Sequence, residues 1–82
     1  MALYIELVLP NNPTELRQHQ ERLRYELSKW CYQHGLDYGN IRTHKRDNHQ
    51  RIELPSTKAY ELFCISWRPA EADLQQYRLV RN

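Results

Sequence analysis

The chain opens on an alternating pattern that is typical of a β-strand with one buried face. Leu or Ile stands at every second position from Leu3 to Leu9, so these side chains share one face of the strand. Tyr4 and Glu6 lie between them and point to the opposite face. Pro10 ends the strand because proline has no backbone N–H to donate to a sheet.

The segment from Pro13 to His34 is predicted to form a long helix. Asn12 is placed to cap its start, with proline at the first helical position, where its missing N–H costs nothing. Gly35 and Leu36 fit the glycine and the following apolar residue that commonly end a helix. One stripe recurs at spacings of three and four, at Leu16, Gln20, Leu23, Leu27, Trp30, Cys31 and His34. From this stripe we expect Leu16, Leu23, Leu27 and Trp30 to pack on Leu3, Ile5 and Leu7.

The middle of the chain predicts a β-hairpin. Asn40–Lys45 and His49–Leu54 both alternate apolar and polar residues, and the turn between them is rich in Asp and Asn. Pro55 closes the second strand.

The pattern from Ser56 to Trp67 fits a helix, which we favour, and also fits a strand, because periodicity cannot decide so short an apolar run. Ser56 or Thr57 is placed to cap the helix. After a loop at residues 68–70, Gln75–Arg81 is predicted to be the last strand, with Tyr77 and Leu79 facing the core.

These elements follow the order β-α-β-β-α-β in one domain of residues 1–82. We therefore expect the ferredoxin-like fold of the α+β class. In that fold a four-stranded antiparallel sheet carries one long and one short helix on one face. If residues 56–67 form a strand instead, one long helix packs on a four- or five-stranded sheet.

Length and composition exclude several classes of protein. A chain of 82 residues is too short for a multidomain enzyme, and no apolar run approaches the roughly 20 residues of a membrane span. The two cysteines, Cys31 and Cys64, are too few for a disulfide framework, and we expect both to be buried thiols. Twelve basic and ten acidic residues give a net charge of +2, which by itself implies neither a nucleic-acid nor a membrane partner.

One segment resembles a known group of proteins. Ala59-Tyr60-Glu61-Leu62-Phe63-Cys64-Ile65-Ser66-Trp67, which follows the predicted strand at Arg51–Leu54, is similar to a segment of small uncharacterised proteins of T4-like tailed phages. The resemblance implies a phage accessory protein acting in the bacterial host cytoplasm. It implies no enzymatic activity.

We find no pattern that predicts a metal site or a catalytic site. One group of four residues has the side-chain types that bind zinc, but its spacing matches no known zinc motif. It consists of Cys31, His34, His44 and His49. Glu6, Glu53 and His44 are the candidates for acid–base chemistry, and so thin a core leaves little room for a substrate pocket. We therefore expect no cofactor, no metal, no small-molecule substrate and no catalysis.

The basic residues matter more by position than by number. In the predicted sheet, one face stays free of helices and carries Tyr4, Glu6, Arg42, His44, Arg51, Glu53 and Arg78. The hairpin adds Lys45 and Arg46, and the last strand adds Arg81. We predict a partner-binding surface formed by Tyr4, Arg42, His44, Lys45, Arg46, Arg51 and Arg78.

The same residues also fit a solvated face on which Arg and Glu form cross-strand pairs. Two hypotheses follow if this surface binds a partner. In the first, it binds another protein, from the phage or the host, or a second copy of the chain, because Arg and Tyr are enriched in protein interfaces. In the second, it binds RNA or single-stranded nucleic acid, with bases stacked on the sheet. Glu6 and Glu53 favour the first hypothesis because exposed carboxylates repel phosphate. Reversing Arg42 and Arg51 to Glu is expected to leave the fold intact.

Overall fold

The computed structural model describes residues 3–81, without the side chains of Leu3 and Arg81. Its elements are, in chain order, β1 (Leu3–Val8), α1 (Pro13–Gln33), the 3-10 turn η1 (Tyr38–Asn40), β2 (Arg42–Arg46), β3 (His49–Glu53), α2 (Thr57–Ser66), α3 (Ala72–Gln75) and β4 (Arg78–Arg81).

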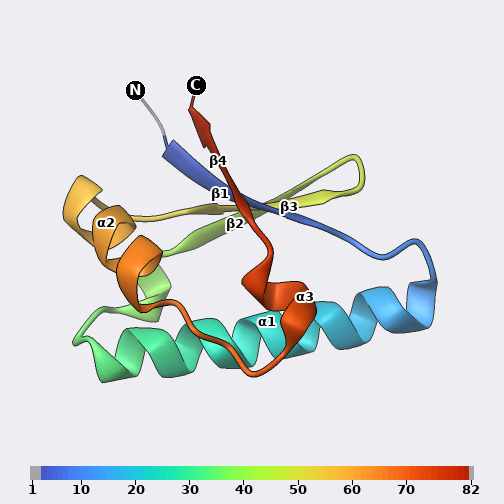
Figure 1. Ribbon diagram of the computed structural model, residues 1–82, viewed down its shortest axis with the longest axis horizontal. Coiled ribbons are helices and arrows are strands. Elements are labelled where there is room, and N and C mark those ends of the chain that lie inside the picture. Colours follow the sequence, from blue (N-terminus) through green and yellow to red (C-terminus); the bar gives the residue numbers. More distant parts are fainter. Residues whose placement is uncertain (1–2, 82) are drawn as a thin grey trace.

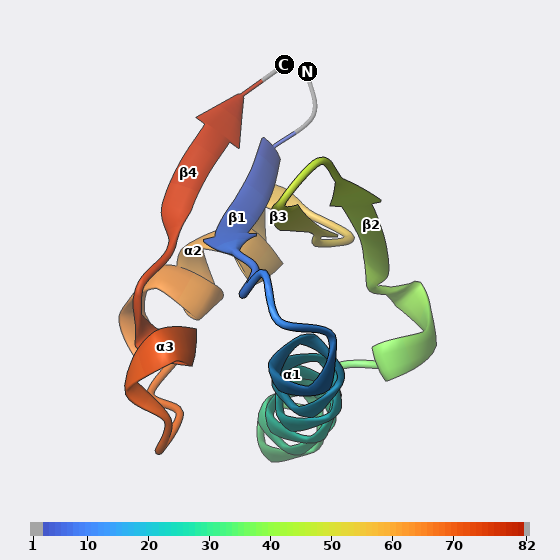
Figure 2. The same ribbon diagram turned by 90° about the vertical axis from the view of Figure 1, so that its right-hand side faces the viewer.

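The four strands form one open antiparallel sheet in the order β2-β3-β1-β4. The described helices all lie on one side of the sheet, and none of them lies on the other side (Figures 1 and 2). The predicted α+β class and the four-stranded antiparallel sheet are confirmed. The fifth strand of the alternative prediction is wrong, because residues 57–66 form α2.

Local signals set both ends of α1. The Asn12 side chain accepts hydrogen bonds from the backbone N–H groups of Thr14 (2.9 Å) and Glu15, as the predicted N-cap should. At the other end Gly35 adopts a φ of 69°, a left-handed conformation that costs glycine little. The Leu36 N–H then donates to the Cys31 carbonyl at 2.8 Å, which is the backbone pattern of a Schellman motif.

The hairpin forms close to its predicted position. Two residues, Asp47 and Asn48, connect β2 and β3, and Asp47 takes the positive φ of 54° that such a tight turn requires. Strand β2 begins two residues later than predicted, because η1 occupies residues 38–40. Ile41 is buried just before the strand starts.

The helical interpretation of the segment after the hairpin is confirmed. Ser56 caps α2 through a hydrogen bond from the backbone N–H of Ala59 to its hydroxyl. Ala59, Phe63 and Trp67 are buried on one side, so the spacing of four residues that supports a helix is the one that forms.

The C-terminal segment differs most from the prediction. Residues 72–75 form α3 rather than the beginning of a strand, and β4 starts only at Arg78. Leu74 explains the difference: its side chain is buried in the core, and its carbonyl accepts a hydrogen bond from the Trp67 indole at 2.8 Å. Leu79 was predicted to face the core, but it is 53% exposed, because β4 is an edge strand at the margin of the covered face.

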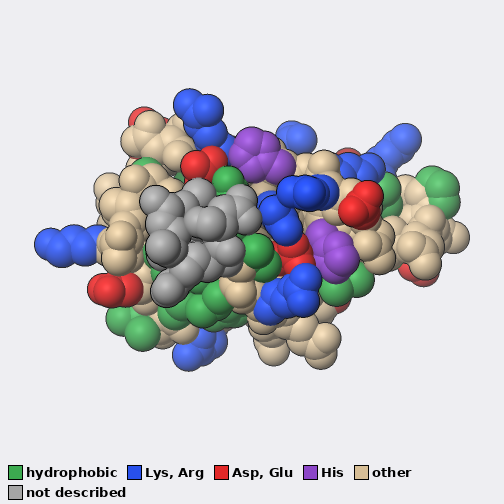
Figure 3. Space-filling view, turned by 90° about the horizontal axis from the view of Figure 1, so that it is seen from above, with side chains coloured by type: hydrophobic (Ala, Val, Ile, Leu, Met, Phe, Trp, Pro, Cys, Tyr) green, Lys and Arg blue, Asp and Glu red, His purple; other side chains and the backbone are tan. Residues whose placement is uncertain are grey.

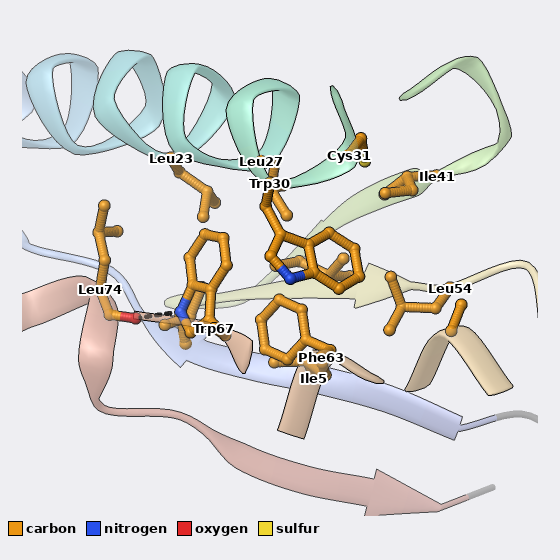
Figure 4. Packing of buried hydrophobic residues seen from close by; sticks show 13 residues of the cluster. Ile5, Leu23, Leu27, Trp30, Cys31, Ile41, Leu54, Phe63, Trp67 and Leu74 are labelled. Carbon is orange, nitrogen blue, oxygen red and sulfur yellow. Dashed lines mark hydrogen bonds between the residues drawn. The ribbon is translucent and has the colours of Figure 1, made fainter. Parts of the chain in front are cut away.

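An aromatic cluster fills the space between the sheet and the helices (Figure 4). The Phe63 ring stacks on Trp67 with centroids 4.7 Å apart and meets the Trp30 ring edge-on at 5.3 Å. The Trp30 indole also donates a hydrogen bond to the Ser66 hydroxyl at 2.8 Å. The buried apolar cluster consists of Ile5, Leu7, Leu23, Leu27, Trp30, Cys31, Ile41, Ile52, Leu54, Ala59, Phe63, Trp67 and Leu74.

The predicted packing of α1 on β1 is confirmed except at Leu16. Leu23, Leu27 and Trp30 belong to the buried cluster, whereas Leu16 is only half-buried. The predicted contribution of Leu3 lies outside the described side chains. Cys64 is half-buried rather than buried, and both it and Cys31 are free thiols.

Candidate functional site

The side of the sheet opposite the helices carries most of the side chains predicted to bind a partner. Residues that face each other across an antiparallel ladder point to the same side. The register aligns Tyr4 with Glu53, which in turn faces Arg42, and it aligns Glu6 with both Arg51 and Arg78. We call this surface the open face. It consists of Tyr4, Glu6, Val8, Arg42, His44, Arg46, His49, Arg51, Glu53, Arg78 and Val80.

Glu6 lies at the centre of the open face and is buried there. Only 3% of it is exposed, although no helix covers this side of the sheet. The Arg51 Nε donates to one carboxylate oxygen at 2.8 Å, and the Arg78 Nε donates to the other at 2.7 Å. The His49 Nε2 lies 3.9 Å from the carboxylate. The carboxylate is therefore enclosed by side chains from the two neighbouring strands.

The two arginines determine the ionisation of this carboxyl group. The hydrogen bond from Arg51 lowers the pKa of Glu6, burial opposes that effect, and Arg78 lowers the pKa further. The net direction is downward from the ordinary value, so Glu6 is the charged partner of a compact ionic cluster. Glu6 was expected to repel phosphate as a carboxylate of the open face, and that argument loses its basis because the charge is enclosed and paired.

The outer layer of the open face is mainly basic. Arg42, His44 and Arg46 on β2 are exposed, and the Arg78 side chain is 71% exposed although it reaches Glu6. Glu53 is half-buried, and its carboxylate lies 3.6 Å from the His44 Nε2. Figure 3 views this face and shows Lys, Arg and His side chains gathered around acidic side chains near its middle.

Tyr4 provides an aromatic group on this face, and it is only half-buried. The Arg51 guanidinium lies over its ring at 5.6 Å from the centroid, a cation–π distance. The His44 ring meets it edge-on at 6.4 Å. Arg51 therefore contacts Glu6 with one part of its side chain and Tyr4 with another. Arg51 is only 17% exposed and is more a part of the scaffold than a free binding group.

Lys45 does not belong to the open face. It pairs with Gln50, which faces Leu7, so its side chain lies on the side of the sheet that carries the helices. The predicted binding set is therefore divided between two surfaces. Tyr4, Arg42, His44, Arg46, Arg51 and Arg78 share the open face, and Lys45 lies on the other side. The predicted contribution of Arg81 lies outside the described side chains.

The four residues considered as zinc ligands are separated in space. Cys31 is buried in the core and His34 is exposed at the end of α1, whereas His44 and His49 lie on the open face. Within residues 3–81 no group of three or more His, Cys, Asp or Glu side chains is arranged to hold a metal ion.

His19 is a buried titratable residue that sequence reasoning missed. It is 1% exposed, and neither ring nitrogen has a hydrogen-bond partner. The Asp73 carboxylate on α3 lies 3.8 Å from the His19 Nε2 and is bound by Arg22 at 2.8 Å. Burial lowers the pKa of His19. The available signal was its position four residues before Leu23, which places it on the buried stripe of α1.

Comparisons with known protein families, with curated proteins and with solved structures found no match for this chain. None of the helices in the described part of the chain is both long enough and apolar enough to cross a membrane.

Proposed function

We propose that this chain is a small non-catalytic binding domain whose open face docks on an acidic surface of another protein. The observation that carries the proposal is the ionic cluster around Glu6. Because Arg51, Arg78 and His49 enclose the central carboxylate, the side chains of Arg42, His44 and Arg46 form the accessible layer. A surface of this kind favours partners of opposite charge and speeds their association.

The same charge distribution favours a different partner over a second copy of this chain. Two open faces brought together would oppose Arg42, Arg46 and Arg78 with like charges, which costs free energy. The only carboxylate in the outer layer that the structure describes is Glu53, and it already lies near His44. A heterologous acidic partner therefore fits this face better than self-association does.

We further propose that the fold is a ferredoxin-like variant and that the chain is a phage-type accessory protein of the host cytoplasm. The strand order β2-β3-β1-β4 is compatible with the split βαβ arrangement, with α3 as an added turn before β4. The proposed phage origin is supported by the segment from Ala59 to Trp67. Its aromatic residues Phe63 and Trp67 are core residues at α2, so the resemblance concerns the fold rather than an activity.

Single-stranded nucleic acid is the alternative partner, and one observation favours it. Glu6 is one of the two carboxylates that were expected to repel phosphate, and its charge is enclosed and paired. A nucleic-acid complex would depend steeply on salt, because each phosphate contact releases counterions.

The experiment that tests the proposed function is affinity capture from a bacterial host lysate, with and without nuclease. The bait is the wild-type chain or the Arg42→Glu/Arg46→Glu variant. The matched control is Arg17→Glu/Lys58→Glu, which changes the net charge equally at exposed positions on α1 and α2. We expect a protein partner that resists nuclease, stays on the control and is lost from the Arg42→Glu/Arg46→Glu bait. A partner retained equally by both variants contradicts the proposal, and a partner released by nuclease supports the alternative.

A further inference from the structure

The edge strand β2 borders a groove on the helix side of the sheet. All five residues of β2 are exposed, and no strand pairs with its outer edge within the described chain. Beneath it lies a groove of about 320 Å³, in which Leu23, Arg24 and Leu27 of α1 face Thr43 and Lys45 of β2, with Tyr38 of η1 nearby.

The arrangement of the helices explains why this groove exists. α2 and α3 lie toward the β4 side of the sheet, and α1 runs beneath its middle (Figure 2). Only the short turn η1 flanks β2 on the helix side. The sheet therefore extends past its helical cover at β2. The buried side chains of Leu23 and Leu27 lie at the floor of the groove, and Gln20 and Gln50 also line it.

The hairpin register fixes which backbone groups point into solvent at this edge. Only two residues separate Arg46 from its partner His49, so these two residues form the hydrogen-bonded pair next to the turn. Because bonded pairs alternate along an antiparallel ladder, the N–H and C=O groups of Thr43 and Lys45 point away from β3. The backbone N–H and C=O groups of Thr43 and Lys45 can therefore pair with a further strand directly above the groove.

The charges at this edge favour an acidic partner over a second copy of the strand. Arg24 and Lys45 border the groove, and neither forms an ion pair within the described residues. Arg42, His44 and Arg46 line the same edge on the open face. A second β2 strand paired with this one would bring like charges together, whereas acidic side chains would form favourable cross-strand pairs.

We infer that β2 accepts an extended acidic segment of a partner protein as a fifth strand. The backbone of the segment pairs with Thr43 and Lys45, and alternate side chains enter the groove. A small side chain of the segment lies over the groove floor at Leu23, beside Tyr38, and a neighbouring carboxylate on the same side of the segment meets Arg24 and Lys45. The groove lies on the opposite side of the sheet from the ionic cluster of the open face, so the Arg24→Glu/Lys45→Glu and Arg42→Glu/Arg46→Glu variants distinguish this inference from the proposed function.

The test measures binding of a blocked, fluorescently labelled peptide, Glu-Thr-Val-Thr-Glu-Thr, to the full chain by fluorescence anisotropy. We expect the Arg24→Glu/Lys45→Glu variant to bind about tenfold more weakly or worse, a loss of about 1.4 kcal/mol. The matched control Arg17→Glu/Lys58→Glu should bind like the wild type. A peptide N-methylated along one backbone edge should lose affinity, because strand addition requires its N–H groups.

Hydrogen exchange of the amides locates the peptide without any variant. Binding should slow exchange at Thr43 and Lys45, whose N–H groups become paired, and leave exchange at β4 unchanged. Three results would overturn the inference: equal binding by both double variants, no added protection at these amides, or loss of binding only in the Arg42→Glu/Arg46→Glu variant. The last of these would place the peptide on the open face.

Discussion

Ile5 and Glu6 are adjacent in β1 and are almost equally inaccessible to water, but they are buried for opposite physical reasons. Ile5 points to the side that the helices cover, where Trp30, Phe63 and other apolar side chains pack against the sheet. Glu6 points to the open face, where the side chains of Arg51 and Arg78 form its cover. One face of the sheet is therefore stabilised by apolar area and the other by an ionic cluster.

The difference shows how a sheet with helices on only one side can have two ordered faces. Apolar burial on the covered side is non-directional and holds the fold together. The cluster on the open face is directional, because two guanidinium groups bind the two oxygens of one carboxylate. It orders the cationic side chains in the middle of the face, while those on β2 remain exposed.

The largest expected effect belongs to the covered face. Trp30→Ala removes the ring that contacts Phe63 and the indole that binds Ser66, and we expect a loss of roughly 3–5 kcal/mol in the free energy of unfolding. Tyr32→Ala on the exposed side of the same helix is the control and should change stability by less than about 0.5 kcal/mol. Equal urea midpoints for the two variants would refute the packing described here.

A smaller but still large effect is expected at the centre of the open face. Arg51→Ala leaves the buried Glu6 carboxylate with one guanidinium partner fewer, and should cost roughly 3 kcal/mol. Arg42→Ala, at an exposed position of the same face, should cost less than about 0.5 kcal/mol. Chemical denaturation of both variants measures this difference.

The same contacts change one expectation drawn from the sequence. Arg51→Glu would place a second carboxylate beside Glu6, so it cannot serve as a neutral charge reversal on this face. If Arg51→Ala were as stable as Arg42→Ala, the ionic cluster would contribute nothing to the fold, and the contrast between the two faces would fail.

The smallest effect concerns pH and His19. Burial lowers the pKa of this histidine, so the folded protein holds it neutral while the unfolded chain binds a proton near the ordinary histidine pKa of 6.5. The contribution of neutral His19 to the free energy of unfolding is present above pH 6.5. It is lost as the pH falls toward the lowered pKa that this histidine has in the folded protein. We expect the urea midpoint of the wild type to fall more than that of His19→Leu between about pH 7.5 and about pH 5.5. Parallel pH profiles would contradict the burial of a neutral imidazole.

The sequence predicted those parts of the fold that local signals determine. Asn12, Pro13 and Gly35 set the ends of α1 through caps and a left-handed residue, each within one turn of the helix. Strand alternation likewise placed Tyr4, Glu6, Arg42 and Arg51 on one face. Signals of this kind are complete within a few residues and need no knowledge of tertiary contacts.

The missed features depend on contacts between distant segments. α3 is too short to be stable by propensity alone, and the contact between Trp67 and Leu74 holds it in place. The exposure of Leu79 follows from the edge position of β4. The burial of Glu6 requires Arg51 and Arg78, which lie 45 and 72 residues away in sequence. His19 is the exception, because its spacing from Leu23 was visible in the sequence.

The most direct test of the contrast between the two faces is the pKa of Glu6, measured by NMR from the side-chain carboxyl carbon during an acid titration. We predict a value below the ordinary glutamate pKa of 4.5, because Arg51 and Arg78 hold the carboxylate in its charged form. We also predict that the pKa rises in Arg51→Ala, which removes the largest contribution. A Glu6 pKa at or above 4.5 in the wild type would contradict the pairing, because burial without effective pairing raises the pKa of a carboxyl group.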